Sequence, residues 1–233
     1  MQLNSVEPRK LRDPPYLVDE FALAKIDDRA FYVIGGNAQN YSGEITRPYC
    51  TKFDIKRSDW IRVSEMNLPR ANHSACSLNG FIYVFGGRSS LDNELQSQLR
   101  TSQSIEKFDA FLDMRSNPKK VVWSLIELKD CRRSMIRSIV VPFVLSDEIL
   151  IFGGQSMSEG TPCTYIFNVE TEKIKVEKSL ARGDFQRVGN NEQALKENGT
   201  VFFTTALNEV IHFCSYNRRD SDINIIDKIK DAD

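Results

Sequence analysis

The sequence predicts an all-β protein built from one repeated unit. Three apolar runs each end at a pair of glycines: residues 31–34 before Gly35 and Gly36, residues 81–85 before Gly86 and Gly87, and residues 149–152 before Gly153 and Gly154. Before the second run, the dipeptide Asn79-Gly80 predicts a tight β-hairpin, because both residues tolerate the positive φ angles of a two-residue turn. The first and second pairs are 51 residues apart, and the second and third are 67 residues apart. These spacings indicate a repeat of roughly 50 residues.

Two further anchors follow each glycine pair in the same order. An aromatic residue followed by an acid or amide recurs as Phe53-Asp54, Phe108-Asp109 and Phe167-Asn168. A large apolar residue then closes each unit, at Trp60, Trp123 and Ile174. The spacing between these two anchors is longer in the second unit because of an insert at residues 111–120.

With its glycine pairs, downstream aromatics and closing tryptophans, the sequence resembles the kelch repeat family over roughly residues 16–217. The resemblance implies an all-β, kelch-type β-propeller with about four recognisable four-stranded blades. Ile174 departs from the family pattern because a Trp is expected there, and the fourth unit has no glycine pair. Four blades is the low end for propellers. A small ring, a larger ring with unrecognised blades, and an incomplete array completed by another chain or by further residues all stay open.

We expect one kelch-repeat domain over residues 1–233, with blades at residues 16–66, 67–130, 131–180 and 181–230. Residues 1–15 contain Pro8, Pro14 and Pro15, which exclude regular structure over their span. By analogy with other propellers, this N-terminal segment is interpreted as a lead into the first blade or as a strand that closes the ring.

The strands of the first and third blades follow from apolar alternation and turn residues. The first blade is expected to have strands at residues 21–26, 31–34, 49–55 and 60–63, and the third at residues 137–144, 148–152, 163–168 and 173–176. The second blade carries inserts at residues 88–103 and 111–120. In the first insert, Leu91, Leu95 and Leu99 recur every four residues and predict a short helix packed on the rim.

The fourth blade is degenerate. Its strands are expected at residues 191–196, 200–204 and 210–216, and the isoleucines of residues 223–229 fit either a strand or a helix.

Structural roles are assigned to the glycine pairs and the tryptophans. Gly35, Gly36, Gly86, Gly87, Gly153 and Gly154 are expected where a strand near the crowded axis turns, since glycine permits positive φ and close backbone approach. Trp60 and Trp123 are expected to be buried between adjacent blades.

Composition and charge exclude several classes of protein. A net charge of -1 without a block of like charges is not typical of proteins that bind nucleic acid or an anionic membrane surface. No apolar run reaches the roughly 18 residues of a membrane span, and the N-terminus lacks the features of a secretory signal. We therefore expect a cytoplasmic protein, with an association with the cytoskeleton left open.

The sequence contains few residues in arrangements typical of catalysis or metal binding. His73 lies in a run that matches the kelch pattern and His212 lies in an expected strand, so neither is interpreted as catalytic. Five cysteines without a C-x-x-C pair indicate reduced, packed thiols rather than disulfides or a zinc site. No phosphate-binding loop, nucleophile elbow or metalloprotease motif occurs. We predict no catalytic residue, no cofactor and no metal.

The resemblance implies a non-enzymatic scaffold that binds a protein partner through loops on one face of a rigid disc. Such partners include cytoskeletal filaments and substrates of ubiquitin-ligase adaptors. The contact candidates are in the first insert of the second blade: Arg88, Asp92, Glu94 and Arg100. Two alternatives stay open, a purely architectural subunit of a larger assembly, and an enzyme of the kelch-like oxidase or sugar mutarotase type.

Overall fold

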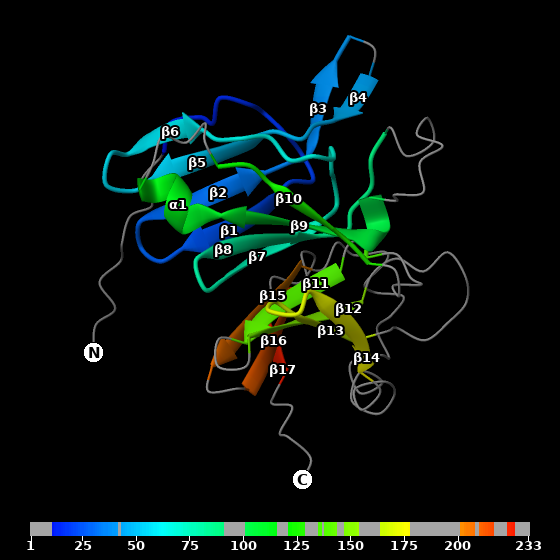
Figure 1. Cartoon of the computed structure of the whole chain (residues 1–233). Coiled ribbons are helices and arrows are strands. Elements are labelled where there is room, and N and C mark those ends of the chain that lie inside the picture. Colours follow the sequence, from blue (N-terminus) through cyan, green and yellow to red (C-terminus); the bar gives the residue numbers. More distant parts are fainter. Residues whose placement is uncertain are drawn as a thin grey trace.

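The computed structural model describes residues 11–41, 43–90, 101–115, 121–128, 135–136, 138–143, 147–153 and 164–177, together with strands at 201–207, 210–216 and 223–226. These residues form three four-stranded antiparallel sheets, a three-stranded sheet and a separate two-stranded hairpin (Figure 1). The prediction of a nearly all-β propeller fold is confirmed. We call the sheets blades 1 to 4 in chain order.

Blade 1 has the strand order β1-β2-β5-β6. Its strands are β1 (Ala22–Ile26), β2 (Ala30–Ile34), β5 (Cys50–Asp54) and β6 (Asp59–Arg62). They coincide within two residues with the strands expected from apolar alternation. Between β2 and β5 the chain forms a hairpin that the sequence did not predict, made of β3 (Asn37–Asn40) and β4 (Gly43–Thr46).

Blade 2 has the order β10-β9-β8-β7. Its strands are β7 (Ser74–Leu78), β8 (Phe81–Phe85), β9 (Ser104–Asp109) and β10 (Ser124–Glu127). Asn79 and Gly80 link β7 to β8 with φ angles of 51° and 81°, so the predicted hairpin turn is confirmed. The short helix expected around Leu91, Leu95 and Leu99 lies outside the described residues, and a 3-10 turn, η1 (Thr101–Gln103), precedes β9.

The insert after β9 begins with a helix, α1 (Ala110–Arg115). The carboxylate of Asp109 accepts a hydrogen bond of 2.8 Å from the backbone N–H of Leu112. Asp at this position satisfies one of the free donors at the start of a helix, which explains why the chain turns helical directly after the strand.

Blade 3 has the order β11-β12-β13-β14, with β11 (Ser138–Phe143), β12 (Glu148–Gly153), β13 (Thr164–Asn168) and β14 (Lys173–Glu177). Its four strands match the expected ones.

Blade 4 consists of β15 (Val201–Leu207), β16 (Val210–Tyr216) and β17 (Ile223–Ile226). Residues 223–226 are therefore a strand, and the strand expected at 191–196 lies outside the described residues.

The first strands of successive blades are neighbours. β1 contacts β7, β7 contacts β11, and β11 contacts β15. Among the described strands of blade 4, β15 is therefore the one that lies against the first strand of blade 3. The sheets follow one another as propeller blades do (Figure 1), and the described strands of blade 4 contact blade 3 through β11 and β15.

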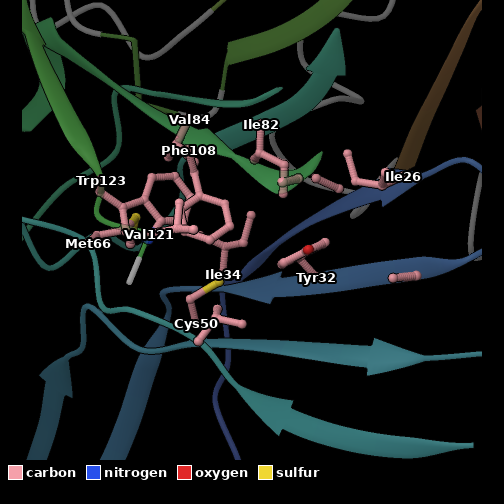
Figure 2. Packing of buried hydrophobic residues seen from close by; sticks show 14 residues of the cluster. Ile26, Tyr32, Ile34, Cys50, Met66, Ile82, Val84, Phe108, Val121 and Trp123 are labelled. Atoms are coloured by element: carbon pink, nitrogen blue, oxygen red, sulfur yellow. The ribbon is translucent and has the colours of Figure 1, made fainter. Parts of the chain in front are cut away.

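Two apolar clusters join the blades. The first contains residues of blades 1 and 2, among them Tyr32, Ile34, Phe108 and Trp123 (Figure 2). The second joins blades 2 and 3 and includes Tyr83, Phe85, Ile149, Ile151 and Phe167. Alternate residues of β8 belong to different clusters, because successive side chains of a strand point to opposite faces. The apolar run at residues 81–85 is thus a strand with apolar contacts on both faces.

Glycine pairs occur where each blade meets the start of the next. Gly35, Gly36, Gly86 and Gly87 all have positive φ, between 61° and 104°. A Cβ on Gly35 would lie 2.5 Å from the carbonyl oxygen of Arg70, and one on Gly86 would lie 2.5 Å from the Cβ of Met135. In blade 3, Gly153 ends β12, and Gly154 lies outside the described residues.

The tryptophans occupy different surroundings. Trp123 is 4% exposed in the cluster between blades 1 and 2, and its ring stacks on Phe108 at 4.8 Å. Trp60 was expected to be buried in the same way but is only half-buried, on the face of blade 1 that points away from blade 2. The difference arises because Trp123 faces a preceding blade and Trp60 does not.

Across the described residues, no helix has the length and apolar character needed to cross a membrane.

Candidate interaction face

Loops that follow the glycine pairs gather at one end of blades 1 and 2. The pair Gly35-Gly36 leads into the hairpin β3–β4, and the equivalent pair of blade 2 leads into residues 88–90. Both loops start in the same way, with an antiparallel bridge to the segment that precedes the blade: Asp19 to Asn37, and Ala71 to Arg88. We call the surface made by the hairpin and residues 88–90 the interaction face.

The base of the hairpin is held by a polar cluster. The buried Asn37 donates from Nδ2 to Glu20 Oε2 at 2.8 Å and to Glu44 Oε1 at 2.5 Å. Arg88 donates from Nη2 to the same oxygen of Glu20 at 2.8 Å. Glu20 therefore links the loop of blade 1 to the loop of blade 2 through two charge-assisted hydrogen bonds.

A second link joins the two loops directly. Ser90 donates from its backbone N–H to Thr46 Oγ1 at 3.0 Å, and the backbone N–H of Thr46 lies 3.4 Å from Ser90 Oγ. The reciprocal pair fixes the end of β4 against blade 2. The hairpin is thus attached at its base by two sets of contacts.

Tyr41, at the tip of the hairpin, is fully exposed. The hairpin β3–β4 projects from the body of the protein (Figure 1). An exposed tyrosine on an anchored loop has the amphipathic character that protein interfaces favour.

Of the four contact candidates from the sequence, the structure describes Arg88, whose side chain is half-exposed on this face. Asp92, Glu94 and Arg100 lie outside the described residues. Sequence reasoning missed Glu20, Asn37, Tyr41 and Glu44. The available signal was the polar stretch between Gly36 and Tyr49, which is longer than a turn requires and contains Ser42-Gly43.

Below the face, Arg70 forms a buried ion pair with Glu106, with 3.1 Å between Nε and Oε1. Its Nη1 donates to the carbonyl oxygens of Gly86, Thr101 and Ser104 at 2.6, 3.0 and 3.2 Å. Arg70 thereby orders the turn at Gly86 and η1.

Glu106 accepts further hydrogen bonds from the backbone N–H groups of Asn67 at 2.6 Å and Leu68 at 3.1 Å. The buried charges are therefore well hydrogen-bonded, as buried ion pairs require.

A second buried polar group lies between blade 1 and α1. Asp113 Oδ2 accepts hydrogen bonds from Lys52 Nζ at 2.5 Å and from the hydroxyl of Tyr32 at 2.9 Å. Burial, followed by the carboxylate of Asp113, raises the pKa of Tyr32. The phenol therefore stays protonated and donates, and α1 is tied to blade 1 by a buried ion pair.

His73 was assigned a structural role, and it lies buried among the glycine pairs. A Cβ on Gly35 would approach His73 Cε1 to 2.7 Å, and one on Gly87 would approach His73 Cβ to 2.8 Å. Burial and then the positive charge of Arg70 lower the pKa of His73 to about 3. At neutral pH the imidazole is uncharged. His212 is in β16, and its side chain lies outside the described residues.

Cys50 and Cys76 are buried free thiols, as expected from the cysteine pattern. Burial raises the pKa of both, and Asp113 adds to the effect at Cys50. Protonated, enclosed thiols are poor nucleophiles and metal ligands. In the part of the chain that the structure describes, no three His, Cys, Asp or Glu side chains form a group able to hold a metal ion.

Comparison with known proteins gives one match to a family profile, described as the Kelch motif, over residues 69–110. Kelch-like protein 30 of Homo sapiens is 37% identical over 76 residues, which cover 32% of this chain and 13% of that protein. Kelch-like protein 22 of Xenopus tropicalis is 37% identical over 57 residues, covering 24% and 9%. Gigaxonin of Homo sapiens is 37% identical over 51 residues, covering 22% and 8%. The matched part is therefore a small share of each relative's length.

Among solved structures, the one titled "Structure of YjhT" superposes with a TM-score of 0.58 at 14% sequence identity. The superposition covers 91% of this chain and 80% of the other. At this identity the likeness concerns the fold alone. The match to the Kelch motif at residues 69–110 and the kelch-like relatives support the resemblance of this chain to the kelch repeat family.

Proposed function

We propose that the chain is a non-enzymatic interaction module that binds a protein partner through the interaction face. The observation that carries the proposal is the hairpin β3–β4, which projects from blade 1 with Tyr41 exposed at its tip while its base is anchored to blade 2. A rigid scaffold that presents an anchored loop loses little conformational entropy when it binds.

The kelch-like relatives support this proposal at the level of the family. On the resemblance alone, we also propose that the partner belongs to a cytoskeletal or a ubiquitin-ligase type of assembly. On the same basis we propose that the protein acts in the cytoplasm. Asp92, Glu94 and Arg100 remain proposed contacts beside Arg88.

The test is quantitative affinity capture from the native cell with the unaltered chain, Tyr41→Ala and Arg88→Ala. An exposed aromatic at the centre of a contact is expected to weaken binding roughly tenfold or more when truncated. We expect at least one protein to be captured by the unaltered chain and lost with Tyr41→Ala. Arg88→Ala is expected to weaken the capture, because it removes the link from blade 2 to Glu20.

The matched control is Ile55→Ala. Ile55 is also an exposed apolar residue of blade 1, but it follows β5 and lies at the opposite end of the blade from the glycine pairs. A partner that is lost equally with all three variants would contradict the assignment to the interaction face. A thermal-shift screen with metals and small molecules tests the competing enzyme interpretation, since a ligand that binds only the folded state must raise the melting temperature.

A further inference from the structure

Blades 1 and 2 can be compared residue by residue, because their contacts repeat. The indole N–H of Trp123 donates to the carbonyl oxygen of Ser64 at 2.9 Å, and that of Trp60 donates to the carbonyl oxygen of Arg12 at 2.8 Å. The strands β1 and β7 begin at equal distances along the chain after these two acceptors. The segment from Arg12 to the end of β1 therefore corresponds in order to the segment from Ser64 to the end of β7.

The third strands of the two blades correspond as well. Val33 of β2 and Val84 of β8 each lie two residues before the first glycine of their pair. Val33 pairs with Thr51 of β5, and Val84 pairs with Glu106 of β9. Thr51 is therefore the counterpart of Glu106.

Blade 1 lacks the buried ion pair of blade 2. By this correspondence Val18 stands where blade 2 has Arg70, and Thr51 stands where blade 2 has Glu106. Two shorter, uncharged side chains thus replace a guanidinium and a carboxylate. A space at this place in blade 1 follows from the loss of side-chain volume.

A small pocket occurs at this place. It has about 180 Å³ of free space out to its open mouth and is lined by Tyr16, Val18, Val33, Gly35, Tyr49 and Thr51. Pockets for drug-sized molecules are larger, about 300–1,000 Å³. The Thr51 pocket, as we call it, therefore suits a single side-chain group. No lining residue is acidic, and within the part of the chain that the structure describes the hydroxyl of Thr51 makes no hydrogen bond.

Two arginines lie beside the pocket. Tyr16 and Tyr49 stack on each other with 4.2 Å between their ring centroids. The guanidinium of Arg62 lies over the ring of Tyr16 at 4.6 Å, and that of Arg47 lies over the ring of Tyr49 at 5.6 Å. Each cation is thereby held against a ring that lines the Thr51 pocket.

Neither arginine has a carboxylate partner among the described residues. Arg62 is exposed on β6, where it pairs across the sheet with Thr51. The Nε of Arg47 is buried and has no hydrogen-bond partner in the described part of the chain. A buried donor without an acceptor costs free energy that a bound acceptor would recover. Blade 1 therefore has positive charge beside this pocket but lacks the carboxylate that accompanies it in blade 2.

We propose that the Thr51 pocket and its two arginines bind a carboxylate side chain in an acidic segment of the partner protein, an inference that rests on the proposed function. The partner then supplies from outside the carboxylate that Glu106 supplies within blade 2. Guanidinium groups suit this task, because they form paired, charge-assisted hydrogen bonds with carboxylates.

The position of Arg47 connects the pocket to the interaction face. Arg47 directly follows β4, and its backbone N–H donates to the carbonyl oxygen of Gly36 at 2.8 Å. It therefore lies at the base of the hairpin β3–β4. A segment bound along the interaction face can reach the Thr51 pocket from there.

The first test measures the binding of a short fluorescent oligoglutamate peptide to the full chain by anisotropy, with oligoglutamine of the same length as the neutral control. We expect saturable binding of oligoglutamate only. Arg62→Gln and Arg47→Gln should each raise its Kd roughly tenfold, because each removes charge-assisted hydrogen bonds. Arg57→Gln is the matched control and should change the Kd by less than about twofold. Arg57 is also an exposed arginine of blade 1, but it lies in the turn between β5 and β6.

The second test places the peptide on the protein. We expect oligoglutamate to shift the methyl NMR resonances of Val18 and Val33 in the unaltered chain, and to shift them much less in Arg62→Gln. An absence of saturable binding, an equal loss of affinity with Arg57→Gln, or binding that leaves both valines unshifted would overturn the proposal.

Affinity capture from the native cell separates this inference from the proposed function. A partner that is lost with Tyr41→Ala but retained in full with Arg62→Gln would contradict the acidic contact and leave the interaction face in place. Oligoglutamate bound at the Thr51 pocket, with no protein captured by the unaltered chain, would support the carboxylate site and contradict the proposed function.

Discussion

The imidazole of His73 lies between the glycine pairs of blades 1 and 2, enclosed by backbone and beside the guanidinium of Arg70. Its pKa of about 3 lies below the usual 6.5 because burial and then Arg70 disfavour the charged form. Below pH 6.5 the unfolded chain therefore binds a proton that the folded chain does not. The contribution of this residue to stability falls as the pH decreases from 6.5 towards 3.

We expect the free energy of unfolding to fall by about 2 kcal/mol between pH 6.5 and pH 5 on account of His73. His73→Gln cannot be protonated in this range and should remove that part of the pH dependence, although its stability at pH 7.5 will be lower. Urea unfolding of both proteins at several pH values measures the slopes. Equal slopes would show that His73 is not the group responsible.

The roles of individual residues could be predicted only in part from the sequence. The run from Arg70 to His73 was assigned a structural role because it resembles the start of a kelch blade. Its partners were not foreseeable, since Glu106 is 36 residues away and is brought to Arg70 by the pairing of β8 with β9. A buried carboxylate has no local sequence signal that distinguishes it from a surface one.

At the scale of elements, strands with apolar alternation were predicted well, because a strand buried on one or both faces needs that pattern. The hairpin β3–β4 was missed because its residues are polar and its strands pack on no apolar core. The helix α1 was missed because its six residues are too few for a periodic signal, and the Asp109 cap that starts it also occurs in turns.

The glycine positions allow a controlled test. Gly86→Ala places a Cβ at 2.5 Å from Met135 Cβ and at 2.6 Å from its carbonyl oxygen, with φ at 61°. Gly43→Ala meets no atom within 4 Å, with φ at 117°. We expect Gly86→Ala to lower the free energy of unfolding by about 2 kcal/mol or more, because the backbone strain and the steric clash both destabilise the folded state.

Gly43→Ala introduces backbone strain without a steric clash, and should lower the free energy of unfolding by about 1 kcal/mol. Thermal and urea unfolding of both variants measure the difference. Similar losses would mean that close approach of the blades is not what requires glycine at position 86.

At the scale of the molecule, blades are held together by apolar contact between faces. Trp123→Ala removes a buried ring from the junction of blades 1 and 2. It should lower the free energy of unfolding by about 3–5 kcal/mol. Trp60→Ala removes a ring that is only half-buried, on the face of blade 1 that points away from blade 2, and should lower the free energy of unfolding by about 1–2 kcal/mol. Urea unfolding of both variants provides the comparison, and equal losses would contradict the different burial of the two rings.

The sequence by itself determined the repeat, the all-β class, most strand positions and the need for glycine at the ends of β2 and β8. These depend on local patterns, namely apolar alternation and positive φ, which neighbouring residues encode. Only the tertiary structure decided which face each strand presents, that Trp123 is enclosed while Trp60 is not, and that Glu20, Asn37 and Arg88 meet at one end of the blades. These properties depend on pairing between segments far apart in the chain, and register between such segments is set by the packing of the whole array rather than by any stretch within it.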